Sequence, residues 1–136
     1  MINHVTLWVN DIEESKKFYQ AVLEPLGYVL LKDSKPKWIG FGMQDQKTER
    51  DFWLKEGAVS GKVISCFAFT AKNKNAVDEF FKNAINAGGK DNGAPDYRPE
   101  YSENYYAAFV FDPNGYNIEA IWEDPSRPGK LINNWG

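Results

Sequence analysis

The sequence predicts an α+β fold made of two βαβββ units, which form a curved mixed sheet around a cleft. The first observation is an internal repeat, because shifting the chain by 62 positions places His4 on Cys66 and Gly27 on Gly89. The second is that each half reads as a strand, an amphipathic helix, a glycine and three further strands. A unit this small cannot bury its own sheet face, so we expect the halves to pack together with the functional cleft between them.

Length and composition favour a single globular domain. The chain has 136 residues, of which 43% are hydrophobic and 15% aromatic, so it can build a core. The net charge of −3 gives no electrostatic reason to bind nucleic acid or an anionic membrane. One cysteine, no apolar run of roughly 18–20 residues and no signal-peptide pattern indicate a cytoplasmic protein. We expect one domain over residues 1–136, with unit 1 (1–60), unit 2 (61–123) and an irregular tail (124–136).

The first half of the chain has clear start and stop signals. Ile2–Val9 alternates and predicts a strand. Asp11 then favours a helix start, because its side chain can cap the first turn and Glu14 follows at capping-box spacing. Gly27 favours the helix end, since glycine adopts a left-handed backbone at little cost. Further strands are predicted at Tyr28–Leu31, Trp38–Met43 and Phe52–Leu54.

The second half repeats this plan. Val63–Ala71 predicts a strand, and a helical stripe of apolar residues then predicts a helix over Asn75–Ala87 that ends at Gly88 and Gly89. The stripe consists of Val77, Phe80, Phe81, Ala84 and Ile85. Lys90–Ser102 is rich in Asn, Gly, Pro and Asp, and predicts a loop. The final predicted hairpin consists of Tyr105–Phe111, a turn at Asp112–Gly115, and Tyr116–Trp122.

The paired units, the opening strand with His4 and the phrase DPNGYNIEAI at Asp112–Ile121 resemble the vicinal oxygen chelate superfamily. That superfamily includes glyoxalase I, extradiol dioxygenases, fosfomycin-resistance enzymes and bleomycin-binding proteins. The stretch DNGAPDYRPEY resembles a subgroup of bacterial glyoxalase/bleomycin resistance-like proteins. The resemblance covers about residues 1–123 and implies recognition of a small organic molecule in the sheet cleft.

The resemblance also implies where a metal would bind. In metal-using members the ligands come from the first and last strands of each unit, which correspond here to His4, Trp53, Cys66 and Glu119. His4 and Glu119 match the usual pattern, whereas Trp53 cannot ligate a metal and Cys66 stands where histidine is usual. The remaining His4, Cys66 and Glu119 would give a three-ligand site that favours zinc, with Glu119 as the catalytic residue. Alternatively, Cys66 is a small buried hydrophobe and Glu119 faces solvent.

Two departures from the family pattern narrow the activities that the resemblance implies. His4 is the chain's single histidine, so one chain cannot build a two-histidine, one-carboxylate iron site, which counts against an extradiol dioxygenase. Trp53 removes the first unit's carboxylate or amide ligand, which counts against a true glyoxalase I.

Aromatic residues gather in the strands and the loop that are expected to border the cleft. The predicted ligand-binding residues are Trp38, Trp53, Arg98, Tyr101, Tyr105 and Tyr106. Flat aromatic side chains with a nearby arginine suit an aromatic, anionic small ligand. The alternative interpretation is that several of these residues belong to the core or to a dimer interface.

Three functions therefore stay open. The chain is an enzyme that uses one divalent metal ion (a lyase, isomerase or transferase), a metal-free protein that binds and sequesters a small molecule, or a partner-binding module with a vestigial cleft. We also predict a homodimer, because the resemblance implies paired units and the tail carries apolar anchors. Those anchors are Leu131, Ile132 and Trp135.

Overall fold

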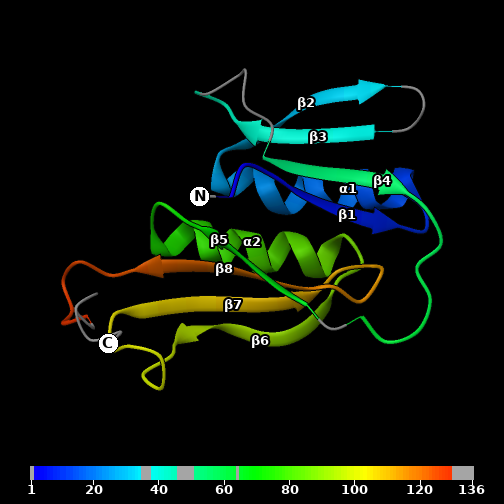
Figure 1. The fold of residues 1–136 in the computed structure, drawn as a ribbon. Coiled ribbons are helices and arrows are strands. Elements are labelled where there is room, and N and C mark those ends of the chain that lie inside the picture. The colour runs from blue at the N-terminus through cyan, green and yellow to red at the C-terminus, as the bar shows by residue number, and fades with distance from the viewer. Residues whose placement is uncertain (1, 35–37, 46–50, 64, 130–136) are drawn as a thin grey trace.

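The computed structural model describes residues 2–34, 38–45, 51–63 and 65–129. Its elements are β1 (Val5–Val9), α1 (Ile12–Leu23), the short 3-10 helix η1 (Glu24–Leu26), β2 (Tyr28–Ser34), β3 (Trp38–Met43), β4 (Phe52–Glu56), β5 (Cys66–Thr70), α2 (Lys74–Asn86), β6 (Lys90–Tyr97), β7 (Tyr105–Phe111) and β8 (Asn117–Glu123). Within these residues the strands form two four-stranded sheets of equivalent order, β1-β4-β3-β2 and β5-β8-β7-β6 (Figure 1). This arrangement confirms the predicted α+β fold.

The internal repeat extends to the pairing of individual residues. The first strand of each unit pairs in parallel with the last, so β1 lies beside β4 and β5 beside β8. Thr6 is opposite Trp53, and its repeat equivalent Ala68 is opposite Glu119. Trp53 and Glu119 therefore occupy equivalent positions in the two sheets.

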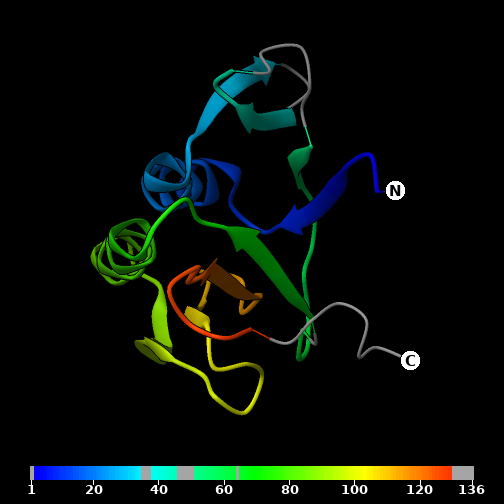
Figure 2. The same cartoon turned by 90° about the vertical axis from the view of Figure 1, so that its left-hand side faces the viewer.

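One face of each sheet is covered by a helix. Figure 2 shows α1 and α2 side by side on one side of the molecule, with the sheets curving away on the other. The core lies between the helices and the sheets. Phe18 and Tyr19 of α1 and Phe80 of α2 are completely buried there. Within the part of the chain that the structure describes, the opposite surface of each sheet carries no helix, and we call it the helix-free face.

Local capping explains where α1 begins and ends. The Asp11 carboxylate accepts hydrogen bonds from the backbone amides of Glu13 and Glu14 at 3.0 and 3.1 Å, which confirms the predicted cap. The chain then passes through η1 to Gly27, whose φ of 88° lies in the left-handed region.

Helix α2 follows the same rules. It starts one residue earlier than predicted, because Asn73 caps it by accepting a hydrogen bond from the Ala76 amide at 2.8 Å. It ends at Asn86, shortly before Gly88 reverses the chain with a φ of 96°. Among the described residues, neither this helix nor any other is long and apolar enough to cross a membrane.

The loop predicted at Lys90–Ser102 is wrong for its first part, because β6 occupies Lys90–Tyr97. This strand lies at the sheet edge, pairs with β7, and has register irregularities on both sides of Gly93. An edge strand with mostly exposed side chains tolerates the polar, glycine- and proline-containing composition that favours a loop in isolation. Three other strands start later than predicted, since β1 begins at Val5, β5 at Cys66 and β8 at Asn117.

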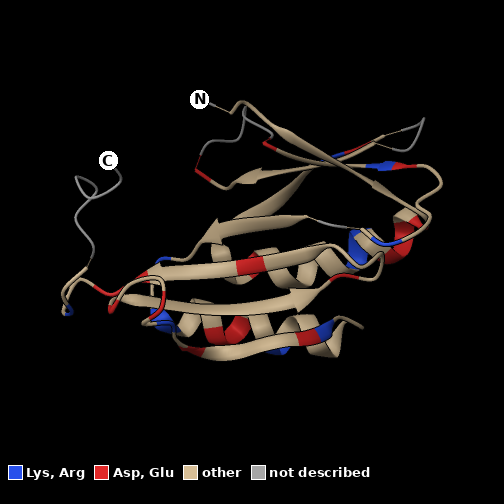
Figure 3. Cartoon of the chain, turned by 60° about the horizontal axis from the view of Figure 1, so that its bottom comes forward, with Lys and Arg blue, Asp and Glu red and all other residues tan. Residues whose placement is uncertain are grey.

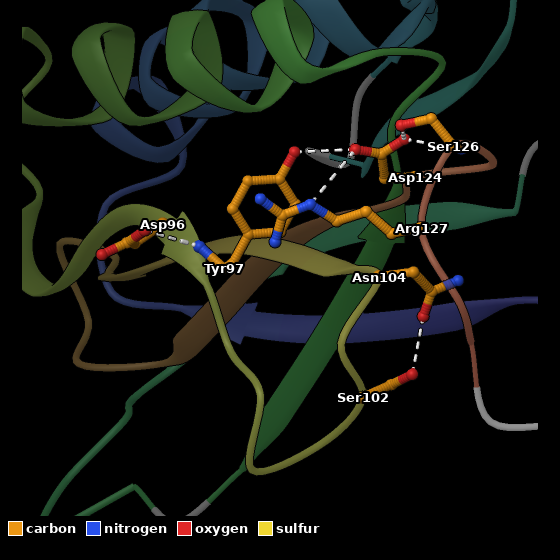
Figure 4. A network of polar contacts seen from close by, with 7 residues as sticks. All are labelled: Asp96, Tyr97, Ser102, Asn104, Asp124, Ser126 and Arg127. Atoms are coloured by element: carbon orange, nitrogen blue, oxygen red, sulfur yellow. Dashed lines mark hydrogen bonds and ion pairs between the residues drawn. The ribbon is translucent and has the colours of Figure 1, made fainter.

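A polar network holds the chain after β8 against β6 (Figure 4). The Tyr97 hydroxyl donates to the Asp124 carboxylate at 2.7 Å, and the Ser126 hydroxyl donates to the same carboxylate at 2.6 Å. The Arg127 guanidinium stacks 3.4 Å from the centre of the Tyr97 ring. Hydrogen bonds from Ser126 and Tyr97 hold the pKa of Asp124 below its usual value. The predicted tail anchors, Leu131, Ile132 and Trp135, lie outside the described residues.

The turn between β7 and β8 of the second unit forms hydrogen bonds with the first unit. The Asn114 side chain accepts from the Asn10 amide at 2.9 Å and donates to the Ser15 hydroxyl at 3.1 Å. The Tyr116 hydroxyl donates to the Trp8 carbonyl at 2.8 Å. The turn of the second unit thus lies against the start of α1 in the first.

Candidate functional site

Glu119 is a buried carboxylate in the middle of a strand. Figure 3 shows charged residues mainly in the helices, loops and strand ends, with an acidic segment inside β8. Glu119 is 5% exposed and lies opposite Ala68 of β5 and Phe109 of β7. Because its strand neighbours Ile118 and Ala120 point to the buried helix side, Glu119 points to the helix-free face.

Both oxygens of Glu119 are engaged by uncharged donors from the two neighbouring strands. The Tyr105 hydroxyl of β7 donates to Oε1 at 2.5 Å. The Cys66 thiol of β5 lies 3.8 Å from Oε2 and donates to it. Three adjacent strands therefore converge on one carboxylate, and we call Cys66, Tyr105 and Glu119 the carboxylate cluster.

The carboxylate cluster shifts the proton affinity of all three members. Burial raises the pKa of Glu119, while the hydrogen bonds from Tyr105 and Cys66 and the positive charge of Arg98 partly oppose that rise. Burial also raises the pKa of the Tyr105 hydroxyl and of the Cys66 thiol, and the nearby carboxylate raises both further. Near neutral pH the tyrosine and the thiol therefore keep their protons and act as donors.

Arg98 and Tyr101 extend this site along the second sheet. The Arg98 guanidinium donates to the carbonyl oxygens of Ala94 and Ala107 and lies 5.5 Å from the centre of the Phe109 ring. The Tyr101 ring is 52% exposed and lies 5.2 Å from the Tyr105 ring. The structure thus brings the predicted ligand-binding residues Arg98, Tyr101 and Tyr105 close to Glu119.

Tyr106 is placed elsewhere. Its side chain is 5% exposed, and its hydroxyl donates to Asp78 of α2 at 2.5 Å. Successive side chains of a strand point to opposite faces, so Tyr106 faces α2 while Tyr105 faces Glu119. The structure therefore does not bring Tyr106 to the helix-free face.

A pocket of about 340 Å³ lies where β1 of the first unit meets β5 of the second, and we call it the seam pocket. Its walls include Ile2, Asn3, His4, Val5, Tyr28, Asp51, Phe52, Cys66, Phe67, Ala68 and Phe69. His4 and Cys66, predicted to be equivalent in the repeat, both line it. Because Cys66 also contacts Glu119, the seam pocket adjoins the carboxylate cluster.

The donor set does not fit the metal site that the family resemblance implies. His4 is exposed, and its Nδ1 is hydrogen-bonded to the Asn3 side chain at 2.8 Å. Among residues 2–34, 38–45, 51–63 and 65–129, no three His, Cys, Asp or Glu side chains lie close enough to hold a metal ion. Trp53 occupies the position equivalent to Glu119, so the first sheet supplies an indole where the second supplies a carboxylate.

The remaining predicted residues, Trp38 and Trp53, lie on the helix-free face of the first sheet. Their ring centres are 6.2 Å apart in an edge-to-face arrangement. The Lys55 ammonium lies 4.3 Å from the Trp38 ring centre and 4.6 Å from that of Trp8. Sequence reasoning missed Trp8 and Lys55, although the alternation Trp53, Leu54, Lys55 in a strand places Lys55 on the same face as Trp53.

Comparisons with known proteins agree with this architecture. The sequence model of the Glyoxalase/Bleomycin resistance protein/Dioxygenase superfamily matches residues 1–120. A probable lactoylglutathione lyase from Vibrio parahaemolyticus is 28% identical over 137 residues, and the match covers 94% of each chain. The crystal structure of a glyoxalase/bleomycin resistance protein from Albidiferax ferrireducens is 27% identical, with a TM-score of 0.75 over 88% of this chain and 97% of that one. A FosX variant from Listeria monocytogenes, crystallised with Mn(II), is 17% identical with a TM-score of 0.65 over 88% and 87% of the two chains, and shares the fold.

Proposed function

Because the chain belongs to the glyoxalase/bleomycin resistance protein/dioxygenase superfamily, we propose that it recognises a small organic molecule at the carboxylate cluster and the adjoining seam pocket, without a metal ion. One observation carries the proposal. Glu119 is 5% exposed on the helix-free face, and the side chains that bond to it are the uncharged Tyr105 and Cys66. A buried carboxylate without a bonded cation is costly to maintain for structure alone, and a ligand that donates to it recovers part of that cost.

The surroundings of Glu119 define the ligand chemistry. The carboxylate can accept a hydrogen bond from an amide, hydroxyl or amine group of the ligand. Of the aromatic residues that line the seam pocket, the half-buried Phe67 can pack against the apolar part of the same molecule, whereas Phe52 and Phe69 are almost completely buried in the core. The pocket volume of about 340 Å³ suits a molecule of one or two rings.

The first prediction concerns metal content. We expect protein purified without added metal to contain well below one zinc ion per chain, because Trp53 replaces one family ligand and His4 bonds to Asn3. Elemental analysis of the wild type measures this content directly. The opposite result would be a full equivalent of zinc that His4→Ala and Glu119→Ala each remove while Trp53→Ala does not, and it would favour the metal-assisted enzyme instead.

The second prediction concerns the Glu119 carboxylate as a hydrogen-bond acceptor. We expect para-fluorobenzamide, followed by fluorine NMR, to bind about tenfold more tightly than its N,N-dimethyl derivative, which lacks the donor. Since the ionised carboxylate is the stronger acceptor, the affinity should fall as the pH drops through the raised pKa of Glu119. Glu119→Gln should weaken binding and remove this pH dependence.

A matched variant separates the local effect of Glu119 from the change in net charge. Glu24→Gln removes one negative charge at an exposed position of η1 and should leave the affinity and its pH dependence unchanged. Equal binding of both benzamides by the wild type and by Glu119→Gln would contradict the proposed function, as would no binding at millimolar concentration.

A further inference from the structure

We propose that the helix-free face of the first sheet is a second binding site, which takes a small aromatic anion such as an aryl carboxylate. Its residues are Trp8, Trp38, Trp53 and Lys55, and we call them the tryptophan–lysine row. The inference goes beyond the proposed function, because the side chains that hydrogen-bond to Glu119 are Tyr105 and Cys66, and the walls of the seam pocket are formed by residues outside this row.

The strand register builds the tryptophan–lysine row. Lys55 of β4 is opposite Trp8 of β1 on one side and opposite Trp38 of β3 on the other. Two residues earlier on β4, Trp53 is opposite Thr6 of β1 on one side and opposite Gly40 of β3 on the other. Directly opposed residues in a sheet point to the same face, so three indoles and one ammonium group share one surface.

Lys55 carries a charge that no anion neutralises within the described part of the chain. Its Nζ lies between two indole faces, at 4.6 Å from the Trp8 ring centre and 4.3 Å from the Trp38 ring centre. The ion pairs that the described residues form involve other lysine and arginine side chains. Cation–π contacts hold the ammonium group in place but leave its net positive charge available to an anionic ligand.

Two glycines fix the indole rings against the backbone. A Cβ atom added at Gly40 would lie 2.9 Å from the Trp53 ring, and one added at Gly57 would lie 2.4 Å from the Trp8 ring. A side chain at either glycine would therefore displace the indole ring beside it. Aromatic surfaces held in place in this way lose little conformational entropy when another ring packs against them.

The combination of groups defines the ligand class. The indoles of Trp8 and Trp53 offer apolar surface to a planar ring, and Trp8 is 48% exposed. The single ammonium of Lys55 matches one carboxylate or sulfonate attached to that ring. A polyanion such as nucleic acid fits poorly, because the chain carries a net charge of −3.

The experiment compares naphthoate with its methyl ester, which has the same ring system without the charge and without a hydrogen-bond donor for Glu119. We expect the wild type to bind naphthoate more tightly than the methyl ester in ligand-observed NMR titrations. Lys55→Met keeps the aliphatic stem and should weaken naphthoate binding about fivefold while leaving binding of the methyl ester unchanged. Lys17→Met, an exposed position on α1, makes the same change in net charge and should affect neither ligand.

A second set of variants separates stacking from charge. Trp53→Ala should weaken both ligands to a similar extent, because it removes aromatic surface and leaves Lys55 in place. Glu119→Gln should leave naphthoate binding unchanged, so failure of the proposed function and failure of this inference give different results. Equal naphthoate affinity in the wild type and Lys55→Met would overturn the inference, as would the same loss in Lys17→Met. No naphthoate binding at millimolar concentration, for example because a second copy of the chain covers the row, would also overturn it.

Discussion

Replacing Phe80 with aspartate is expected to lower the free energy of unfolding by about 4 kcal/mol or more. Phe80 is completely buried between α2 and its sheet. The substitution removes a large aromatic side chain from the core and places a carboxylate without a partner in the space that remains. Because small domains are stabilised by about 5–15 kcal/mol in total, much of the protein should be unfolded, as measured by urea denaturation.

Two variants control for the separate parts of this change. Phe80→Leu removes volume without adding a charge and should cost about 1–2 kcal/mol, which keeps the protein folded and measurable. Asn75→Asp adds a carboxylate at an exposed position in the first turn of α2, where the helix dipole favours a negative charge, and should cost nothing. A Phe80→Asp protein with the stability of the wild type would refute the predicted packing of this helix face.

The fold was predictable because both halves of the chain repeat apolar residues at spacings that indicate burial. The apolar stripe of α2, the caps and the final hairpin each have strong local signals, and they recur in both halves. Strand β6 escaped prediction because it lies at a sheet edge, where pairing with β7 rather than its own composition determines its structure.

The candidate site was only partly predictable, because it depends on the face of the sheet to which each side chain points. The resemblance brought Glu119, Cys66 and Trp53 to attention, and the register shows that Trp53 and Glu119 hold equivalent positions. It did not reveal that Tyr105 donates to Glu119 while Tyr106 points to the other face. Adjacent tyrosines look alike in the sequence, and only the exact strand register separates them.

Replacing Asp112 with alanine is expected to lower the free energy of unfolding by about 3 kcal/mol, because the change removes several hydrogen bonds at once. One carboxylate oxygen accepts from the buried Tyr19 hydroxyl at 2.5 Å. The other accepts from the amides of Asn114 and Tyr116 at 2.9 and 2.8 Å and shapes the turn that joins the two units. The alanine variant would leave the Tyr19 hydroxyl buried without a partner and free both amides, and urea denaturation measures the loss.

Asp112→Asn and the pH together test whether the charge or the hydrogen bonds of Asp112 stabilise the fold. Asparagine keeps an oxygen for the turn amides, and its amino group faces the Tyr19 hydroxyl, so it should cost about half as much as alanine.

Burial raises the pKa of Asp112, so the folded state binds the proton more tightly than the unfolded state. Between the ordinary carboxyl pKa of about 3.9 and this raised pKa, the wild type should therefore gain stability relative to Asp112→Asn as the pH falls. Asp124, whose pKa is lowered, makes the folded state lose stability on acidification in both proteins, so its effect cancels in the comparison. A difference that does not change with pH, or one that shifts in favour of Asp112→Asn, would contradict a buried, costly charge at this turn.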